Sequence, residues 1–165
     1  MNVDNIYKIN SLKLLKKMMC DNEFSYDVYF RMAVIEEYFN NNNQIWDLYD
    51  NMQFTRANLI RFVPKHMINH KDKFIELINS IKDNGFDSES PLLVNKDYMV
   101  IDGAHRMACA LYFNIDDVFI KTTDEYINFI PNEYTKKWFE ENNLSECIPY
   151  AEKQKEKIKE LIKDV

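Results

Sequence analysis

Residues 102–106 read Asp-Gly-Ala-His-Arg and place an acid, an imidazole and a guanidinium beside a glycine. The apolar pair Val100-Ile101 precedes them and small and apolar residues follow, which is typical of a buried strand that gives way to a helix. Gly103 is one of only two glycines in the chain, and glycine permits a sharp turn and a close approach of the backbone to a ligand. This stretch is therefore the first candidate for a functional site.

A helix that begins after Gly103 would offer an anion-binding site. The N–H groups of its first turn have no partner inside the helix, and they carry a partial positive charge of about half a unit. The backbone of Gly103 and Ala104, with the side chains of His105 and Arg106, would then surround an anion such as a phosphate.

Asp102 does not suit a bare anion site, because its carboxylate would repel the ligand. It suits a site that also holds a metal ion such as Mg²⁺, or a hydroxyl group from which a proton is removed. The ordinary structural alternative is that Asp102 caps the helix, that His105 is a satisfied polar residue and that Arg106 is a surface charge.

His66 and His70 are four residues apart, which is the spacing of a metal-binding pair on a helix. The segment follows Pro64, and Asn69 is a candidate cap for the next helix. We therefore expect the two imidazoles not to share a helix face. The alternatives are a loop position and a place in the wall of a cleft.

Five charged residues interrupt the aromatic-rich stretches of the N-terminal part: Arg31, Glu36, Glu37, Arg56 and Arg61. Arg56 and Arg61 are candidates to join a phosphate site. The alternative is that all five are surface charges, because Arg and Glu usually lie at the surface.

Composition and charge limit the class of protein. The chain has 165 residues, 46% of them hydrophobic, which predicts one folded domain with a sizeable core. The net charge of -6 makes nucleic acid an unexpected partner, because binding to duplex DNA depends on Lys and Arg. A small phosphorylated ligand needs only a local positive site.

The three cysteines, Cys20, Cys109 and Cys147, are widely separated and show no metal-ligand spacing. This predicts reduced thiols in a cytoplasmic protein, with Cys109 in the core. The sequence predicts neither a leader peptide nor a stretch that spans a membrane.

Hydrophobic periodicity predicts an α+β fold in which three parts form one compact domain. They are a helical N-terminal extension at 1–58, a β-α-β-β-α-β core at 59–122 and C-terminal helices at 123–165. Helices of the extension are expected at 11–19 with Ser11 as cap, at 26–40 after Ser25 as cap, and at 44–56. The core is expected to contain strands at 59–63, 91–94, 98–101 and 116–121 and helices at 69–85 and 102–114. The C-terminal helices are expected at 132–143, with Asn132 or Glu133 near the start, and at 150–165.

The stretch from Leu59 to Lys121 resembles the ParB/sulfiredoxin superfamily. The resemblance is carried by FIELINSIKDNGF, a helix that closes in Asn-Gly, by SPLLV, and by VIDGAHRMACALY. The DGAHR box is similar to the DGHHR box of the free-serine kinases and to the GCHR box of sulfiredoxins.

The resemblance implies roles for the matching residues. In the kinase and sulfiredoxin branches the His-Arg pair binds nucleotide phosphates, which implies this role for His105 and Arg106 with the backbone of Gly103 and Ala104. In the kinase branch the Asp belongs to the catalytic centre, which implies a catalytic Asp102.

Three departures from the family patterns are informative. Ala104 stands where sulfiredoxins have their cysteine, which argues against reductase chemistry. The GAHRMA stretch has one arginine where partition-type ParB proteins have three, which argues against a DNA clamp. His66 lies nearest the position of the catalytic Glu of the serine kinases, so a kinase mechanism would use His66, Asp102 or a more distant carboxylate as the base.

The sequence is therefore expected to encode a kinase that uses ATP or ADP with Mg²⁺ and phosphorylates a small metabolite. The acceptor hydroxyl would belong to an amino acid, an amino alcohol or a sugar-related polyol. Asp102, His105 and His66 would be catalytic, with Asp102 also at the metal. The alternatives are a non-catalytic nucleotide-binding module and a ParB-like DNA-binding or nuclease protein. The YFRMAVIEEYF stretch resembles small proteins of bacterial cell-surface polysaccharide pathways, and a homodimer is compatible with the sequence.

Overall fold

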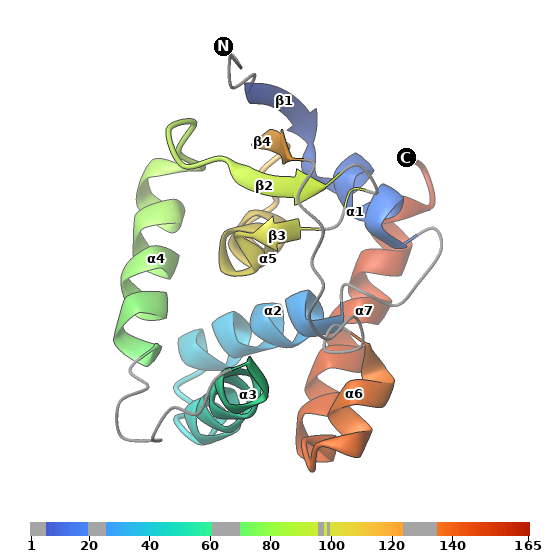
Figure 1. Cartoon of the computed structure of the whole chain (residues 1–165). Coiled ribbons are helices and arrows are strands. Elements are labelled where there is room, and N and C mark those ends of the chain that lie inside the picture. The colour runs from blue at the N-terminus through green and yellow to red at the C-terminus, as the bar shows by residue number, and fades with distance from the viewer. Residues whose placement is uncertain (1–5, 20–25, 61–69, 96–97, 99, 124–134) are drawn as a thin grey trace.

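The strands that the structure describes form one four-stranded sheet with the order β1-β4-β2-β3 (Figure 1). The computed structural model describes residues 6–19, 26–60, 70–95, 98, 100–123 and 135–165. Strand β4 pairs with β1 in antiparallel and with β2 in parallel orientation, and β2 and β3 form an antiparallel pair. The strands are β1 (Ile6–Asn10), β2 (Leu92–Asn95), β3 (Val100–Asp102) and β4 (Asp117–Thr123).

Helices make up most of the rest, so the fold is mixed α+β as the sequence predicts. They are α1 (Ser11–Met19), α2 (Tyr26–Phe39), α3 (Ile45–Ile60), α4 (Lys71–Asn84), α5 (Ala104–Tyr112), α6 (Lys136–Glu141) and α7 (Ile148–Ile162), with a short 3₁₀ helix at Ser145–Cys147. Helix α4 stands at one side of the sheet, and α6 and α7 stand at the other (Figure 1). None of the described helices is long and apolar enough to cross a bilayer.

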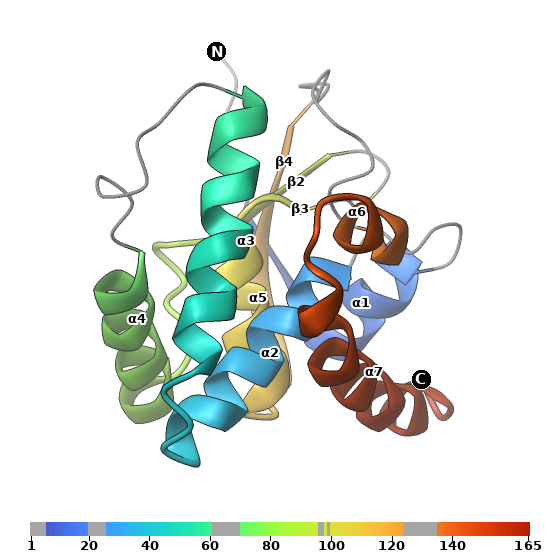
Figure 2. The same ribbon diagram turned by 90° about the horizontal axis from the view of Figure 1, so that it is seen from below.

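Helix α2 lies in the middle of the helical layer and contacts α7, α5 and α3 (Figure 2). The sequence predicts one apolar face formed by Val28, Met32, Ile35 and Phe39. The first three are buried, but so is every residue from Tyr26 to Ile35. A helix that is packed against other helices on all sides carries apolar side chains, or polar side chains with partners, on every face. The prediction of a single apolar face is therefore incomplete.

The start of α1 corrects the predicted cap. The side chain of Asn10, and not that of Ser11, accepts hydrogen bonds from the N–H groups of Leu12 and Lys13, each at 3.1 Å. The buried Ser11 hydroxyl instead donates to the carbonyl of Ile115 at 2.6 Å. Ser11 therefore ties α1 to the loop that leads into β4.

The strand predicted at 59–63 is not observed at the two of its positions that the structure describes. Leu59 and Ile60 are the last residues of α3, and positions 61–63 lie outside the described residues. A strand that the sequence analysis missed, β1, pairs with β4 from Asn10 opposite Asp117 to Ile6 opposite Lys121. The N-terminal extension therefore contributes a strand to the sheet as well as helices.

The remaining predicted core elements are confirmed. They are helix α4, the hairpin of β2 and β3, helix α5 and strand β4. Gly85 ends α4 with φ +79°, and its N–H donates to the carbonyl of Ile81 at 2.8 Å. Asn69, the expected cap of α4, lies outside the described residues.

The C-terminal helices cover the other side of α2. The hydroxyl of Thr135 caps α6 by accepting a hydrogen bond from the N–H of Trp138 at 3.2 Å, and Asn132 and Glu133 lie outside the described residues. Helix α7 buries Ala151, Gln154 and Ile158, whereas Leu161 on the same helix is 46% exposed. Cys109 and Cys147 are buried free thiols, as expected for Cys109, and Cys20 lies outside the described residues.

Candidate functional site

Gly103 forms the sharp turn between β3 and α5. Its φ is +111°, and a Cβ atom added there would lie 2.6 Å from Leu92 Cδ2 and 3.0 Å from Arg106 Nη2. The first backbone hydrogen bond of the helix runs from the Met107 N–H to the Gly103 carbonyl at 2.8 Å. The N–H groups of Ala104, His105 and Arg106 therefore precede the first intrahelical bond and form the positive end of α5.

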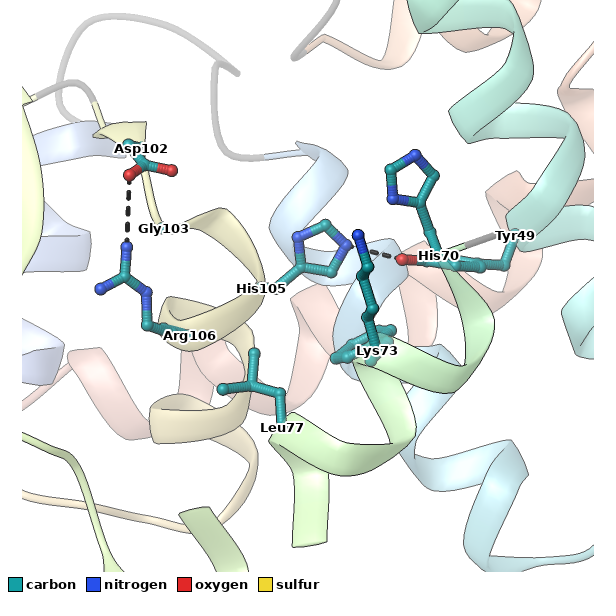
Figure 3. Close-up of a pocket in the computed structure, with 9 residues that line it drawn as sticks. Tyr49, His70, Lys73, Leu77, Asp102, Gly103, His105 and Arg106 are labelled. Carbon is teal, nitrogen blue, oxygen red and sulfur yellow. Dashed lines mark hydrogen bonds and ion pairs between the residues drawn. The ribbon is translucent and has the colours of Figure 1, made fainter. Parts of the chain in front are cut away.

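A cavity of about 280 Å³ lies at this end of α5 (Figure 3). Helix α3 supplies one wall, α4 and the residue before it supply another, and the β3–α5 turn supplies a third. The lining residues are Tyr49, His70, Lys73, Phe74, Leu77, Asp102, Gly103, His105 and Arg106. The structure thus brings the predicted residues Asp102, Gly103, His105 and Arg106 to one cavity together with His70, while Ala104 is partly buried and is not among the lining side chains.

Lys73 is a cavity residue that the sequence analysis missed. Lys73 lies on α4, on the side of the helix that also carries Leu77 and follows His70. The buried face of this helix is formed by Phe74, Ile78 and Ile81. Residues three and seven positions apart share a helix face, so His70, Lys73 and Leu77 were a detectable group. A lysine on that face adds a mobile positive charge to the cavity.

Arg106 is partly committed to the protein itself. Its Nη1 donates to the carbonyls of Ser90 at 2.6 Å and Pro91 at 3.0 Å. Its Nη2 lies 3.5 Å from the carboxylate of Asp102, whose side chain is 77% exposed. Arg106 therefore anchors the loop before β2 to α5 while its charge stays at the cavity wall.

His105 is enclosed by aromatic and cationic groups. Its Nε2 lies 2.7 Å from the Tyr49 hydroxyl and 3.3 Å from Arg31 Nε. The Phe74 ring meets the imidazole edge-to-face at 4.8 Å between centroids. Burial, together with the nearby positive charge of Arg31, lowers the pKa of His105 well below its ordinary value. The imidazole is therefore neutral at pH 7.

Arg31 corrects the interpretation of the N-terminal charges as surface residues. It is fully buried and forms an ion pair with Asp27, which is 2% exposed and lies one helical turn earlier. Arg31 Nη2 also donates to Gln53 Oε1 at 3.2 Å, and Arg56 Nη1 donates to the same oxygen at 3.3 Å. A buried charge needs a partner, and the Asp-Arg spacing of four was the signal for this pair in the sequence.

The other charges singled out in the sequence lie apart from the cavity or outside the description. Glu36 forms ion pairs with Lys153 at 3.2 Å and Lys157 at 2.6 Å. Burial alone would raise the pKa of Glu36, but the hydrogen bonds from these lysines lower it. Glu37 accepts a hydrogen bond from the Asn42 amide at 2.8 Å, and Arg61 lies outside the described residues.

The structure describes one of the two histidines that are four residues apart, His70. His70 precedes α4 and lines the cavity, and burial and the charge of Lys73 lower its pKa. His66, the expected catalytic histidine, lies outside the described residues. Among the residues that the structure describes, no three His, Cys, Asp or Glu side chains form a group that could hold a metal ion. A metal at Asp102 would have this one carboxylate as its ligand from the described residues that line the cavity.

Comparisons with protein-family models, with curated proteins and with solved structures give no match for this chain. The functional assignment accordingly depends on the chemistry of the cavity at the N-terminal end of α5.

Proposed function

We propose that this cavity binds the phosphate groups of ATP or ADP, and that the protein transfers a phosphoryl group to a hydroxyl of a small metabolite. One observation carries the proposal. The cavity joins the positive end of α5 to the charges of Lys73 and Arg106 and has the carboxylate of Asp102 in its wall.

The cavity has the local charge that a phosphate requires, although the chain as a whole carries a net charge of -6. Free N–H groups at a helix N-terminus bind phosphate because they combine donors with a partial positive charge. Lys73 and Arg106 add two full charges, and His105 and His70 add imidazole nitrogens. The site would therefore attract an anion that the rest of the acidic surface repels.

In the proposed reaction the acceptor oxygen forms a bond to the terminal phosphorus, and the bond from that phosphorus to the bridging oxygen breaks. The proton of the acceptor hydroxyl passes to the carboxylate of Asp102. Lys73 and Arg106 stabilise the charge on the phosphoryl oxygens and on the departing phosphate. His66 is retained as a second candidate base, on the resemblance to the serine kinases.

Asp102 fits a role as the protein ligand of Mg²⁺. Magnesium at nucleotide sites is held by one or two carboxylates together with phosphate oxygens and water, and the Asp102 carboxylate is largely exposed to solvent. The ion would supply neutralisation of the phosphate charge.

The size of the cavity supports a small acceptor. A volume of about 280 Å³ is at the lower end of the range of ligand pockets. An amino acid, an amino alcohol or a sugar-related polyol would fit beside the phosphates. The resemblance to small proteins of bacterial cell-surface polysaccharide pathways favours the polyol.

A non-catalytic nucleotide-binding module is the second candidate. It is favoured by the fact that Asp102 is the only carboxylate among the described residues that line the cavity, and that it is 3.5 Å from Arg106. A DNA-binding or nuclease function has less support, because the net charge is -6.

Calorimetric titration with ATP, ADP and CTP, with and without Mg²⁺, tests nucleotide binding. Lys73→Gln should weaken nucleotide binding about tenfold or more, because a charge-assisted hydrogen bond to phosphate contributes roughly 1.5 to 3 kcal/mol. Lys82→Gln is the matched control, since Lys82 is exposed on the same helix and does not line the cavity. Equal affinities for the two variants would contradict the proposed phosphate site.

Transfer of labelled γ-phosphate from ATP to a panel of small alcohols then separates the kinase from the module. Transfer that Asp102→Asn reduces at least 100-fold, while the affinity for nucleotide without Mg²⁺ changes little, would support Asp102 as the base. Binding without transfer to any acceptor would favour the module.

A further inference from the structure

The Nε2 atom of His105 is approached by two hydrogen-bonding groups from two different helices. The Nε of Arg31, on α2, lies 3.3 Å away, and the hydroxyl of Tyr49, on α3, lies 2.7 Å away. Arginine keeps its protons throughout the accessible pH range and has no acceptor atom. The Nε2 atom opposite Arg31 must therefore be unprotonated, because an N–H there would point at another N–H.

We propose that Arg31 and Tyr49 are positioning residues that hold His105 as the neutral tautomer with its proton on Nδ1. His105 then acts as a hydrogen-bond donor to the ligand of the cavity and not as a proton acceptor. The statement about the ligand rests on the proposed function, whereas the statement about the tautomer does not.

The guanidinium of Arg31 is fixed in the position that this role requires. It is fully buried, and its three nitrogens face three partners: Nη1 faces Asp27, Nη2 faces Gln53 and Nε faces His105. The Gln53 oxygen also accepts from Arg56, so the orientation of this amide is determined by two donors. Rotation of the guanidinium would break these bonds inside the core, where a lost partner is costly.

The surroundings of His105 also disfavour its charged form. The groups with positive charge near the ring are Arg31 from α2, Arg56 from α3, Arg106 from α5 and, when protonated, His70. The hydroxyl of Tyr49 stays protonated, because burial raises its pKa. Tyr49 can therefore donate to Nε2 at neutral pH.

Among the residues that the structure describes, no hydrogen bond is made by the second ring nitrogen, Nδ1. In Figure 3 the Nδ1 side of the His105 ring is turned away from Tyr49, towards the side of the cavity where Asp102 and Gly103 lie. A neutral N–H at this place can donate to a phosphate oxygen without the cost of burying a further charge. His105 is then not the group that takes the proton of an acceptor hydroxyl.

The test is nitrogen-15 NMR of the full-length protein labelled at histidine, at pH 7 without ligand. Long-range proton–nitrogen correlations distinguish the two neutral tautomers and the imidazolium. His66→Asn and His70→Asn variants assign the signals of the three histidines. We expect the His105 signals of a single tautomer with the proton on Nδ1, and a proton on Nε2 or on both nitrogens would overturn the inference.

Two variants test which residue imposes the tautomer. The double variant Asp27→Asn with Arg31→Gln removes both members of the buried ion pair, and an amide at position 31 can donate or accept. We expect a mixture of tautomers in this variant. A single Nδ1–H tautomer would show that Arg31 does not set the tautomer of His105. Tyr49→Phe should retain the Nδ1–H tautomer, because Arg31 remains. If the double variant does not fold, the spectrum of the unmodified protein still decides the tautomer.

The failures of the two proposals are distinguishable. If no nucleotide binds but the Nδ1–H tautomer is observed, the proposed function fails and the role of Arg31 stands. If nucleotide binds and is transferred but the proton is on Nε2, the positioning role fails alone. On nucleotide binding we further expect the Nδ1 proton signal of His105 to move, and an unchanged signal would contradict its role as donor to the ligand.

Discussion

At the scale of single residues, the site depends on a glycine whose conformation and surroundings exclude a side chain. Gly103 has a φ of +111°, and a Cβ atom added there would lie only 2.6 Å from Leu92 Cδ2. This places the backbone of α5 against β2 and leaves its first N–H groups at the cavity. Gly85 also has a positive φ, but a Cβ atom added there would have no described atom within 4 Å apart from those of its neighbours in the chain.

Gly103→Ala should lower the free energy of unfolding by about 4 kcal/mol. Backbone strain contributes about 2 kcal/mol and the forced contact with Leu92 about 2 kcal/mol more. Gly85→Ala is the control and should cost only the strain, about 2 kcal/mol. Urea unfolding of the two variants measures the difference, and equal losses would mean that Leu92 moves aside freely.

At the scale of elements, α2 joins the helical layer to the site. Its buried Arg31 reaches His105 on α5 and Gln53 on α3, and its own Asp27 balances the charge. Removing one member of a buried ion pair leaves an uncompensated charge in the core, which costs more than the pair contributes.

Asp27→Asn should therefore destabilise the protein by about 3 to 5 kcal/mol. The control is Lys159→Gln, which breaks the exposed pair with Glu156 and should change the stability by less than about 1 kcal/mol. Thermal or urea unfolding checks both values. A small loss for Asp27→Asn would indicate that water or another group compensates Arg31.

At the scale of the whole molecule, the lowered histidine pKa values link stability to pH. His105 has a pKa well below its ordinary value, and that of His70 is also lowered, in both cases mainly by burial. The unfolded chain therefore binds more protons than the folded chain below about pH 6.5. This contribution to stability is fully present above about pH 6.5 and is lost as the pH falls towards the folded pKa values.

The free energy of unfolding should fall by about 1 kcal/mol for each unit of pH below 6.5 because of His105 alone. His105→Asn should flatten this slope, and His70→Asn should flatten it less, because His70 is the more exposed to solvent. Urea unfolding between pH 7.5 and 5.5 measures the slopes. The lowered carboxylate pKa values of Glu36 and Glu152 act separately, since their contribution is lost only as the pH falls below about 4.5. An unchanged slope in His105→Asn would contradict a buried neutral imidazole.

Much of the fold could be predicted because its signals are local. The periodicity around Phe74, Ile78 and Ile81 specifies α4, and Gly85 marks its end. The run from Val100 to Tyr112 specifies a strand, a turn and a helix, and Gly103 can adopt the conformation that the turn needs. Strand β1 could not be predicted in this way, because its only described pairing is with β4, more than a hundred residues later, and three of its five residues are exposed.

By itself the sequence determined that Asp102, Gly103, His105 and Arg106 lie at the start of a helix, because turn and helix signals depend on neighbouring residues. Only the tertiary structure decided what each side chain faces. It brought the buried Arg31 and the hydroxyl of Tyr49 to the same nitrogen of His105, and it brought Lys73 into the cavity. It also turned two N–H groups of Arg106 towards the carbonyls of Ser90 and Pro91. Packing between helices α2, α3, α4 and α5 sets these contacts, and no spacing within the chain encodes them.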